Sequence, residues 1–355
     1  MKTRFFKLIA AFMTVSVTLL AQDRKDKTAV TYEELYDEPY SVNKLFVHFQ
    51  PIYGELFVTN VNAGFGLEAS YYYQDKADFR AHFRKTYSQK FFDLSRDLAA
   101  NNSDVDNRTQ AFNYIEFGGT YHVKDFEESS KTKMFLYKNS YKGHKWAARV
   151  PLHAEVPCKV RKIYGARLGG IIWNSSTDLN RALEDQDLTN ESLKSGDLPL
   201  PATYYNTETS RDEKLNVFTN IATKGFYVGG SMAWIRNVAV SFDKFEEGID
   251  DLMLTTYIDI LFSPSITIDD VVYTDRDPNT PDDATRTYSV SPLKTKTFGF
   301  RAGVEGKFNR TLSWAYGGEL GYRPSIEGRG FYAMLKISFP VYGTNLDYKV
   351  ESFGK

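Results

Sequence analysis

Residues 62–84 read NAGFGLEASYYYQDKADFRAHFR and alternate between apolar and polar side chains on both sides of a short polar break. Before the break the apolar positions run from Ala63 to Tyr73, and after it they run from Ala77 to Phe83. Alternation with a period of two is typical of β-strands with one apolar and one polar face. The stretch therefore predicts a β-hairpin with residues 74–76 as its turn.

The turn position also predicts the register of this hairpin. If residues 74–76 are the turn, the numbers of paired residues sum to 150, so that Glu68 faces His82 and Ser70 faces Arg80. Opposite charges on neighbouring strands are favourable.

A second hairpin is predicted near the end of the chain, with residues 309–311 as its turn. Paired numbers then sum to 620, which places Arg301 opposite Glu319 on the polar face and Val304 opposite Tyr316 on the apolar face. The same reasoning thus predicts a further pair of opposite charges across neighbouring strands.

The same alternation recurs along most of the chain. It predicts an all-β fold, a transmembrane antiparallel up-and-down β-barrel of about twelve strands, or up to fourteen if the tail adds strands. The predicted strands span residues 44–53, 62–73, 77–87, 111–124, 132–138, 146–160, 161–173, 224–241, 252–262, 296–308, 312–323 and 329–340.

The connections between these strands differ in length. Long polar segments fall at 88–110, 174–223 and 263–295. The other turns, at 74–76, 125–131, 242–251 and 309–311, are shorter. If the N-terminus is periplasmic, every long segment lies outside the cell, which is the known asymmetry of outer-membrane barrels.

The first 22 residues follow the pattern of an export signal. Lys2, Arg4 and Lys7 give a positive start, and an uncharged apolar run from Leu8 to Leu20 follows before the small residue Ala21. Because a spanning helix needs about 20 apolar residues, this run is too short to be a membrane anchor. We therefore expect cleavage near Ala21.

Composition excludes several classes of protein. The single cysteine, Cys158, rules out an intrachain disulfide framework, and its distance from the cleavage region argues against a lipoprotein. Without a basic tract, the chain has no signature of nucleic-acid binding. Aromatic residues make up 15% of the chain although the mean hydropathy is −0.42, as in a barrel whose apolar residues occupy every second position.

On these features the chain resembles Gram-negative outer-membrane β-barrel proteins as a class, over about residues 44 to 340. The resemblance implies aromatic girdles at both membrane interfaces, and it departs from the class at the end Phe353-Gly354-Lys355, because many members end on an aromatic residue. The candidate girdle residues are Tyr71, Phe226, Trp234, Trp314, Tyr322 and Phe339.

The predicted division of the chain is a signal peptide over 1–21, a periplasmic segment over 22–43, the barrel over 44–342 and a tail over 343–355. Segment 22–43 is expected to be a disordered leader, or else a contact for another envelope protein. The expected partners are outer-membrane lipid and other envelope proteins, through this segment or the extracellular loops. Within segment 174–214, a short helix is expected to dock Leu179 and Leu183 on the barrel mouth.

The lumen is the main candidate site. Its predicted residues form either a charged pathway or binding cavity for small polar or charged solutes, or a network of neutralising pairs that fills a narrow barrel. The second interpretation corresponds to a closed structural subunit of a secretion or nutrient-uptake complex. A soluble exported β-sandwich or lectin is a third alternative. The predicted lumen residues are Glu68, Arg80, His82, Arg84, Glu116, His122, Arg149, His153, Glu155, Arg301, Glu305 and Glu319.

Neither catalysis nor a cofactor is expected. His82 and Ser70 with Glu68 contain the groups of a hydrolase, but a salt bridge explains them more simply. The acidic stretch from Asp275 has alternating oxygen ligands but lacks the glycine and glutamate of a calcium loop, with Thr280 and Arg286 in their places.

Overall fold

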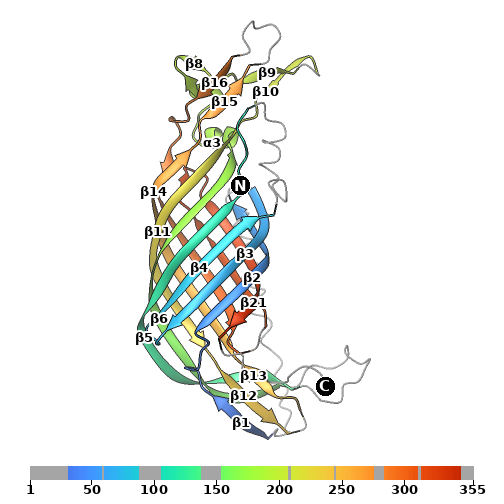
Figure 1. Cartoon of the computed structure of the whole chain (residues 1–355), viewed down its shortest axis with the longest axis vertical. Helices are drawn as coiled ribbons and strands as arrows, with labels where there is room; N and C mark the ends of the chain where they lie inside the picture. Colours follow the sequence, from blue (N-terminus) through green and yellow to red (C-terminus); the bar gives the residue numbers. More distant parts are fainter. Residues whose placement is uncertain are drawn as a thin grey trace, which may run out of the picture.

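The computed structural model describes residues 31–57, 60–87, 105–136, 153–206, 209–243, 245–275, 284–310 and 313–344. It contains a closed antiparallel β-barrel of ten strands (Figure 1). Around the barrel these are β11 (Phe218–Ile235), β14 (Leu252–Ile268), β18 (Phe298–Phe308), β19 (Ala315–Tyr322), β21 (Phe331–Gly343), β2 (Leu45–Phe57), β3 (Asn60–Tyr73), β4 (Ala77–Thr86), β5 (Asn113–Phe135) and β6 (His153–Asp178).

Ten strands replace the predicted twelve because two pairs of predicted strands are continuous. Predicted strand 111–124 and the described part of predicted strand 132–138 fall mostly within β5, and the polar residues 125–131 between them continue the strand instead of forming a turn. Predicted strands 146–160 and 161–173 likewise merge into β6 over their described residues. The polar residues within β5 led to the prediction of a turn. In the structure they belong to the part of β5 that, with β6, forms a ribbon extending below the barrel (Figure 1).

The first predicted hairpin has the expected register. Glu68 pairs with His82 and Ser70 pairs with Arg80, so the alternation and the turn at 74–76 were read correctly. Gln74 and Asp75 adopt positive φ angles of 45° and 54° in this turn, as short hairpin turns require.

The second hairpin is shifted by two residues. Arg301 pairs with Gly321, and Glu319 pairs with Gly303. The predicted register was wrong because β18 ends at Phe308 and β19 begins only at Ala315, so the connection is longer than the predicted three residues. Within this connection, Asn309 donates its backbone N–H to the carbonyl of Asp251, at 2.9 Å.

The upper end of the barrel carries a folded head (Figure 1). Its helices are α3 (Leu179–Glu184) and the 3₁₀ turn η1 (Asn190–Ser192). The expected short helix is confirmed, because the α3 side chains Leu179 and Leu183 are buried in the core that closes the barrel mouth. The short strands are β7 (Lys194–Ser195), β8 (Leu198–Pro199), β9 (Thr203–Asn206), β10 (Arg211–Lys214), β15 (Val271–Thr274), β16 (Thr285–Tyr288), β17 (Thr295–Lys296) and β20 (Ser325–Ile326).

Among the described residues, no helix is long and apolar enough to cross a membrane.

The lower end of the barrel carries a small sheet of β1 (Tyr32–Asp37), β12 (Val238–Phe242) and β13 (Gly248–Asp250). Its apolar side chains, including Val240, pack on those of the β5–β6 ribbon, including Val156. We call this sheet and ribbon the annex. Strand β1 corrects the expectation of a disordered leader for residues 32–37, whereas residues 22–30 lie outside the described residues. The strand escaped sequence reasoning because most of its side chains are exposed and give no apolar face.

Candidate functional site: a charged lumen between two apolar layers

The upper part of the lumen is built around Arg301 on β18. Its guanidinium donates to both carboxylate oxygens of Glu116 on β5, with Nη2–Oε1 and Nη1–Oε2 distances of 2.7 and 2.8 Å. It also donates to Asp259 at 2.8 Å and to Glu319 at 3.3 Å. Arg167 on β6 completes the group by donating to the other oxygen of Asp259 at 2.9 Å. Alternating cations and anions therefore fill this cross-section of the barrel.

Tyrosine hydroxyls satisfy much of the remaining hydrogen-bonding capacity of these carboxylates. Tyr257 and Tyr332 each donate to Glu319, at 2.7 and 2.5 Å, and Tyr114 donates to Glu116 at 2.7 Å. Buried charges are tolerated when their partners and hydrogen bonds are complete.

A second group lies around Arg323, which donates two hydrogen bonds to Glu55 at 3.0 and 2.6 Å. The guanidinium of Arg323 also lies 3.8 Å from the ring centroid of Tyr332. Arg84 approaches the same carboxylate to 3.9 Å and lies over the ring of Tyr114 at 4.2 Å. Cation–π contacts of this kind stabilise cations that have left water.

The lower part of the lumen contains Glu68, His82 and Glu305, whose possible ligand atoms all lie within 4.8 Å of one another. Such a set resembles a metal site, but Lys336 lies between the two carboxylates. Its ammonium donates to Glu68 at 2.8 Å and to Glu305 at 2.7 Å. The lysine thus supplies the positive charge that a bound metal would bring.

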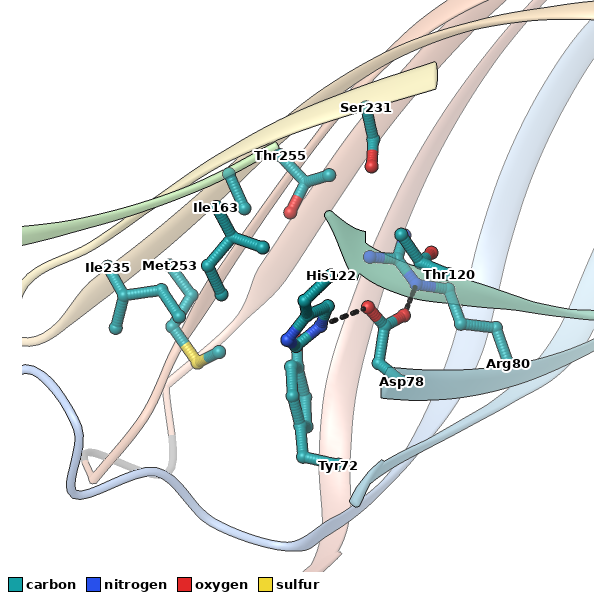
Figure 2. A pocket seen from close by; sticks show the side chains of 11 residues that line it. Tyr72, Asp78, Arg80, Thr120, His122, Ile163, Ser231, Ile235, Met253 and Thr255 are labelled. Atoms are coloured by element: carbon teal, nitrogen blue, oxygen red, sulfur yellow. Dashed lines mark hydrogen bonds and ion pairs between the residues drawn. The ribbon is translucent and has the colours of Figure 1, made fainter. Parts of the chain in front are cut away.

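The chain of charges continues from Glu305 to the lower side of the barrel. Arg80 donates to Glu305 at 2.8 Å and to Asp78 at 2.8 Å. Asp78 also lies 3.3 Å from Nε2 of His122, so that it stands between the imidazole and the guanidinium (Figure 2).

The structure places most of the predicted lumen residues in the barrel interior, but not those near residue 150. His153 and Glu155 are exposed on the annex ribbon, since β6 has left the barrel at that level. Arg149 lies outside the described residues. The predicted residues that lie inside the barrel are Glu68, Arg80, His82, Arg84, Glu116, His122, Arg301, Glu305 and Glu319.

Sequence reasoning missed several of the partners of these residues. Asp259 and Lys336 are single charges in the largely apolar segments TTYIDILF and YAMLKISF, at positions that alternate with outward apolar side chains. Arg167 follows the same pattern between Ala166 and Leu168. A single charged residue at an inward position of an otherwise apolar strand is therefore the sequence signal that identifies these partners.

Apolar layers lie above and below the charged groups. The upper layer includes Trp173, whose ring lies 4.9 Å from that of Phe57, and it is continuous with the core of the head. The lower layer consists of Phe46, Ile163, Ile235 and Met253, and Val42 and Tyr72 pack on it.

Residues 38–43, which we call the strap, connect β1 to β2 at the lower end. Asn309 accepts from the backbone of Asn43 at 2.9 Å and donates to the carbonyl of Ser41 at 2.6 Å. Asn237 donates to the same carbonyl at 3.1 Å. The strap is therefore tied to connections from two separate parts of the barrel.

Small cavities lie among the lower lumen side chains, and two of them are defined by their lining residues. One, of about 10 Å³, is lined by Tyr72, His122 and Met253 among others (Figure 2). The other, of about 20 Å³, is lined by Glu68 and Lys336 among others. Each has room for about one water molecule.

The hydroxyl oxygen of Ser70 accepts a hydrogen bond from the ammonium of Lys307 at 2.7 Å. The acidic stretch considered as a calcium loop lies largely outside the described residues.

Comparison with known proteins gives no family. No protein-family model matches the chain, and no curated protein matches its sequence.

Proposed function

We propose that this chain is an outer-membrane β-barrel that is closed to solutes and serves as a structural subunit of an envelope complex. The observation that carries the proposal is the filled lumen, in which paired charges join opposite walls between two apolar layers. The head and the annex would then offer folded surfaces to partners on the two sides of the membrane.

Membrane location is supported by the outward face of the barrel. Large apolar side chains on the outside of the strands are highly exposed, for example Leu335 at 72% and Ile258 at 67%. Soluble monomers rarely expose contiguous apolar patches larger than a few hundred Å². This pattern argues against the soluble β-sandwich, which would bury its apolar faces.

Aromatic residues support the boundaries of a membrane belt. On β11 the outward side chains run from Phe226 near the head to Trp234, which packs against the annex core, eight residues apart. With about 3.4 Å per residue and a tilt of about 40°, this stretch spans about 20 Å along the barrel axis, close to the height of about 25 Å that lipid-facing belts have.

The leader supports export, and the strand count supports the proposed orientation. An even number of strands returns the last strand, β21, to the end at which β2 begins. With that end in the periplasm, the head formed by the long connections lies outside the cell.

A closed lumen is favoured over a solute pathway because a passing ion would have to break buried ion pairs. A solute crossing the lumen would separate Arg301 from Glu116 and Lys336 from Glu305, pairs whose arginine and lysine side chains are at most 3% exposed. Separation of a buried pair leaves an uncompensated charge, which costs about 3–5 kcal/mol.

The test is a planar lipid bilayer that contains the mature chain, with an open 16-stranded porin as the positive control. We expect membrane insertion, shown by a heat-dependent shift in gel mobility, without steady conductance. Discrete, stable conductance steps would overturn closure and would favour the passage of small polar or charged solutes.

A further inference from the structure

A patch of phenylalanines lies on the outward face of the barrel just below the head. The ring centroids of Phe226 and Phe262 are 5.3 Å apart, and those of Phe262 and Phe298 are 4.8 Å apart. Phe300 extends the patch on β18. Since Phe298 and Phe300 are 59% and 55% exposed, the patch presents a broad apolar surface across β11, β14 and β18.

Two lysines lie directly above this patch. Lys224 is the next outward residue above Phe226 on β11, and Lys296 is the next outward residue above Phe298. Both lysines are exposed, and Nζ of Lys296 lies 5.5 Å from the ring centroid of Tyr322. Within the described part of the chain, neither ammonium has an ion-pair partner.

The two lysines lie close enough to share one anion. Lys224 pairs with Ser265 on β14, and Ser263 donates its backbone N–H to the carbonyl of Thr297, which places Lys296 beside the same part of β14. Two strand spacings separate the lysine backbones by about 10 Å, and the ammonium of Lys296 now lies over Tyr322 on the far side of β18. Its flexible four-carbon side chain has to turn from Tyr322 for the two ammonium groups to converge on one anion.

Among the described residues of β11, β14 and β18, no carboxylate neutralises the pair from the same surface. Along the described residues of β11, β14 and β18 the acidic side chains are Asp259 and Glu305, and both point into the lumen. The surface therefore combines two uncompensated cations with an apolar patch beneath them. A molecule complementary to both has an anionic head and apolar chains.

We propose that Lys224 and Lys296 together bind a phosphate monoester of lipid A in the outer leaflet, with its acyl chains on the phenylalanine patch. The inference rests on the proposed membrane location and orientation. A phosphate monoester suits two lysines because it carries up to two negative charges, whereas the phosphodiester of phosphatidylglycerol carries one. A free phosphate has no chains to use the patch.

The experiment measures binding of fluorescent diphosphoryl lipid A to the full chain in zwitterionic detergent micelles. A cation close to an anionic lipid surface contributes about fivefold in affinity, so the double variant Lys224→Ala/Lys296→Ala should bind about 30-fold more weakly. The matched control is Lys214→Ala, which removes a head lysine paired with Glu184 at 3.1 Å and should leave binding unchanged. Phosphatidylglycerol and inorganic phosphate should compete poorly.

Three results would overturn the inference. The first is equal affinity of the wild-type chain and the double variant. The second is competition by phosphatidylglycerol as strong as that by lipid A, which would remove the preference for a monoester. The third is equally strong competition by inorganic phosphate, which would remove the role of the acyl chains.

Failure of the inference is distinguishable from failure of the proposed function. Vesicle insertion and heat-dependent gel mobility are measured for the wild-type chain and for the Lys224→Ala/Lys296→Ala variant. If both insert but bind lipid A equally, only the lipid site is wrong. If the wild-type chain does not insert at all, the proposed membrane location is wrong, and the lipid site is overturned with it.

Discussion

Arg301 on β18 and Glu116 on β5 form a bidentate ion pair across the barrel, with N–O distances of 2.7 and 2.8 Å. The two strands are not neighbours in the barrel order, so the pair links opposite walls through the lumen. The side chains are 1% and 8% exposed. Because both charges are buried, neither can turn to water when the other is removed.

We expect Glu116→Ala to destabilise the folded barrel by about 3–5 kcal/mol, because it leaves Arg301 with one fewer counter-charge in the interior. Urea unfolding in lipid vesicles, followed by tryptophan fluorescence, measures the change. The matched control is Glu128→Ala on the annex ribbon, where the pair of Glu128 with Lys162 is much more exposed. Surface pairs contribute about 0–1 kcal/mol, so equal losses in both variants would contradict the special role of the lumen pair.

Leu335→Arg tests the proposed lipid-facing belt. Leu335 points outward in the middle of β21 and is 72% exposed. A cation at the bilayer midplane destabilises a barrel by about 2–4 kcal/mol, whereas the same change on a soluble surface has little effect. Urea unfolding in vesicles measures the loss of stability.

The control for this variant is Leu198→Arg, in strand β8 of the head. Leu198 is also exposed, at 53%, but lies outside the proposed belt. We expect a change of less than about 0.5 kcal/mol there. If Leu335→Arg is equally harmless, the outward face of the barrel does not contact lipid.

The sequence predicts an element of the fold where the local pattern of residues determines that element. The pairing register of the first hairpin could be predicted, because its alternation and its turn position agree, and Glu68 pairs with His82 as expected. The annex could not be predicted, because its apolar side chains, such as Val156, alternate as the outward side chains of the barrel do although they face a small protein core. The same alternation placed His153 and Glu155 in the lumen, whereas they are exposed on the ribbon.

The partners within the lumen could not be predicted from local pattern. Alternation indicates that Arg301 and Glu116 point inward, but it does not say which inward residues meet across the barrel. That depends on the number of strands and on the stagger between them. A prediction of twelve strands gives a wider barrel, in which side chains from opposite walls meet less readily than in the ten-stranded one.

Asn309→Ala tests the attachment of the strap. The side chain of Asn309 bonds the backbone of Asn43 and of Ser41, and these bonds are lost in the variant. Loss of partners for buried backbone groups costs about 1–3 kcal/mol, so the strap should open more often and trypsin should cleave after Lys44 about tenfold faster. Limited proteolysis with mass spectrometry measures the rate.

Asn107→Ala is the control, because Asn107 holds two backbone groups in the same way but within the head. It donates to the carbonyl of Asp270 at 2.8 Å and accepts from the N–H of Val272 at 2.8 Å. This variant should leave cleavage after Lys44 unchanged. Equal acceleration in the two variants would mean that general destabilisation, and not release of the strap, exposes the site.

Cys158 reports on the packing of the annex. Its side chain is 4% exposed between the ribbon and the small sheet, and burial raises the pKa of the thiol from 9.0 to about 11. Because the thiolate is the reactive form, iodoacetamide at pH 8 should label the folded chain at least about 100-fold more slowly than the chain unfolded in urea. Fast labelling of the folded chain would show that the annex core is open.

The same thiol makes the stability of the annex depend on pH. A group whose pKa is higher in the folded state stabilises that state below its unfolded pKa, and this contribution is lost as the pH rises through the folded pKa. For Cys158 the loss falls between pH 9.0 and about 11. Other groups also titrate in this range, so the measurement is the difference between the wild-type chain and Cys158→Val, which keeps an apolar side chain but cannot ionise. The stability of the annex against urea is monitored by its resistance to protease. Over this pH range, we expect the wild-type annex to lose more stability than the annex of the variant. Parallel losses in the two chains would mean that the thiol is already hydrated in the folded state.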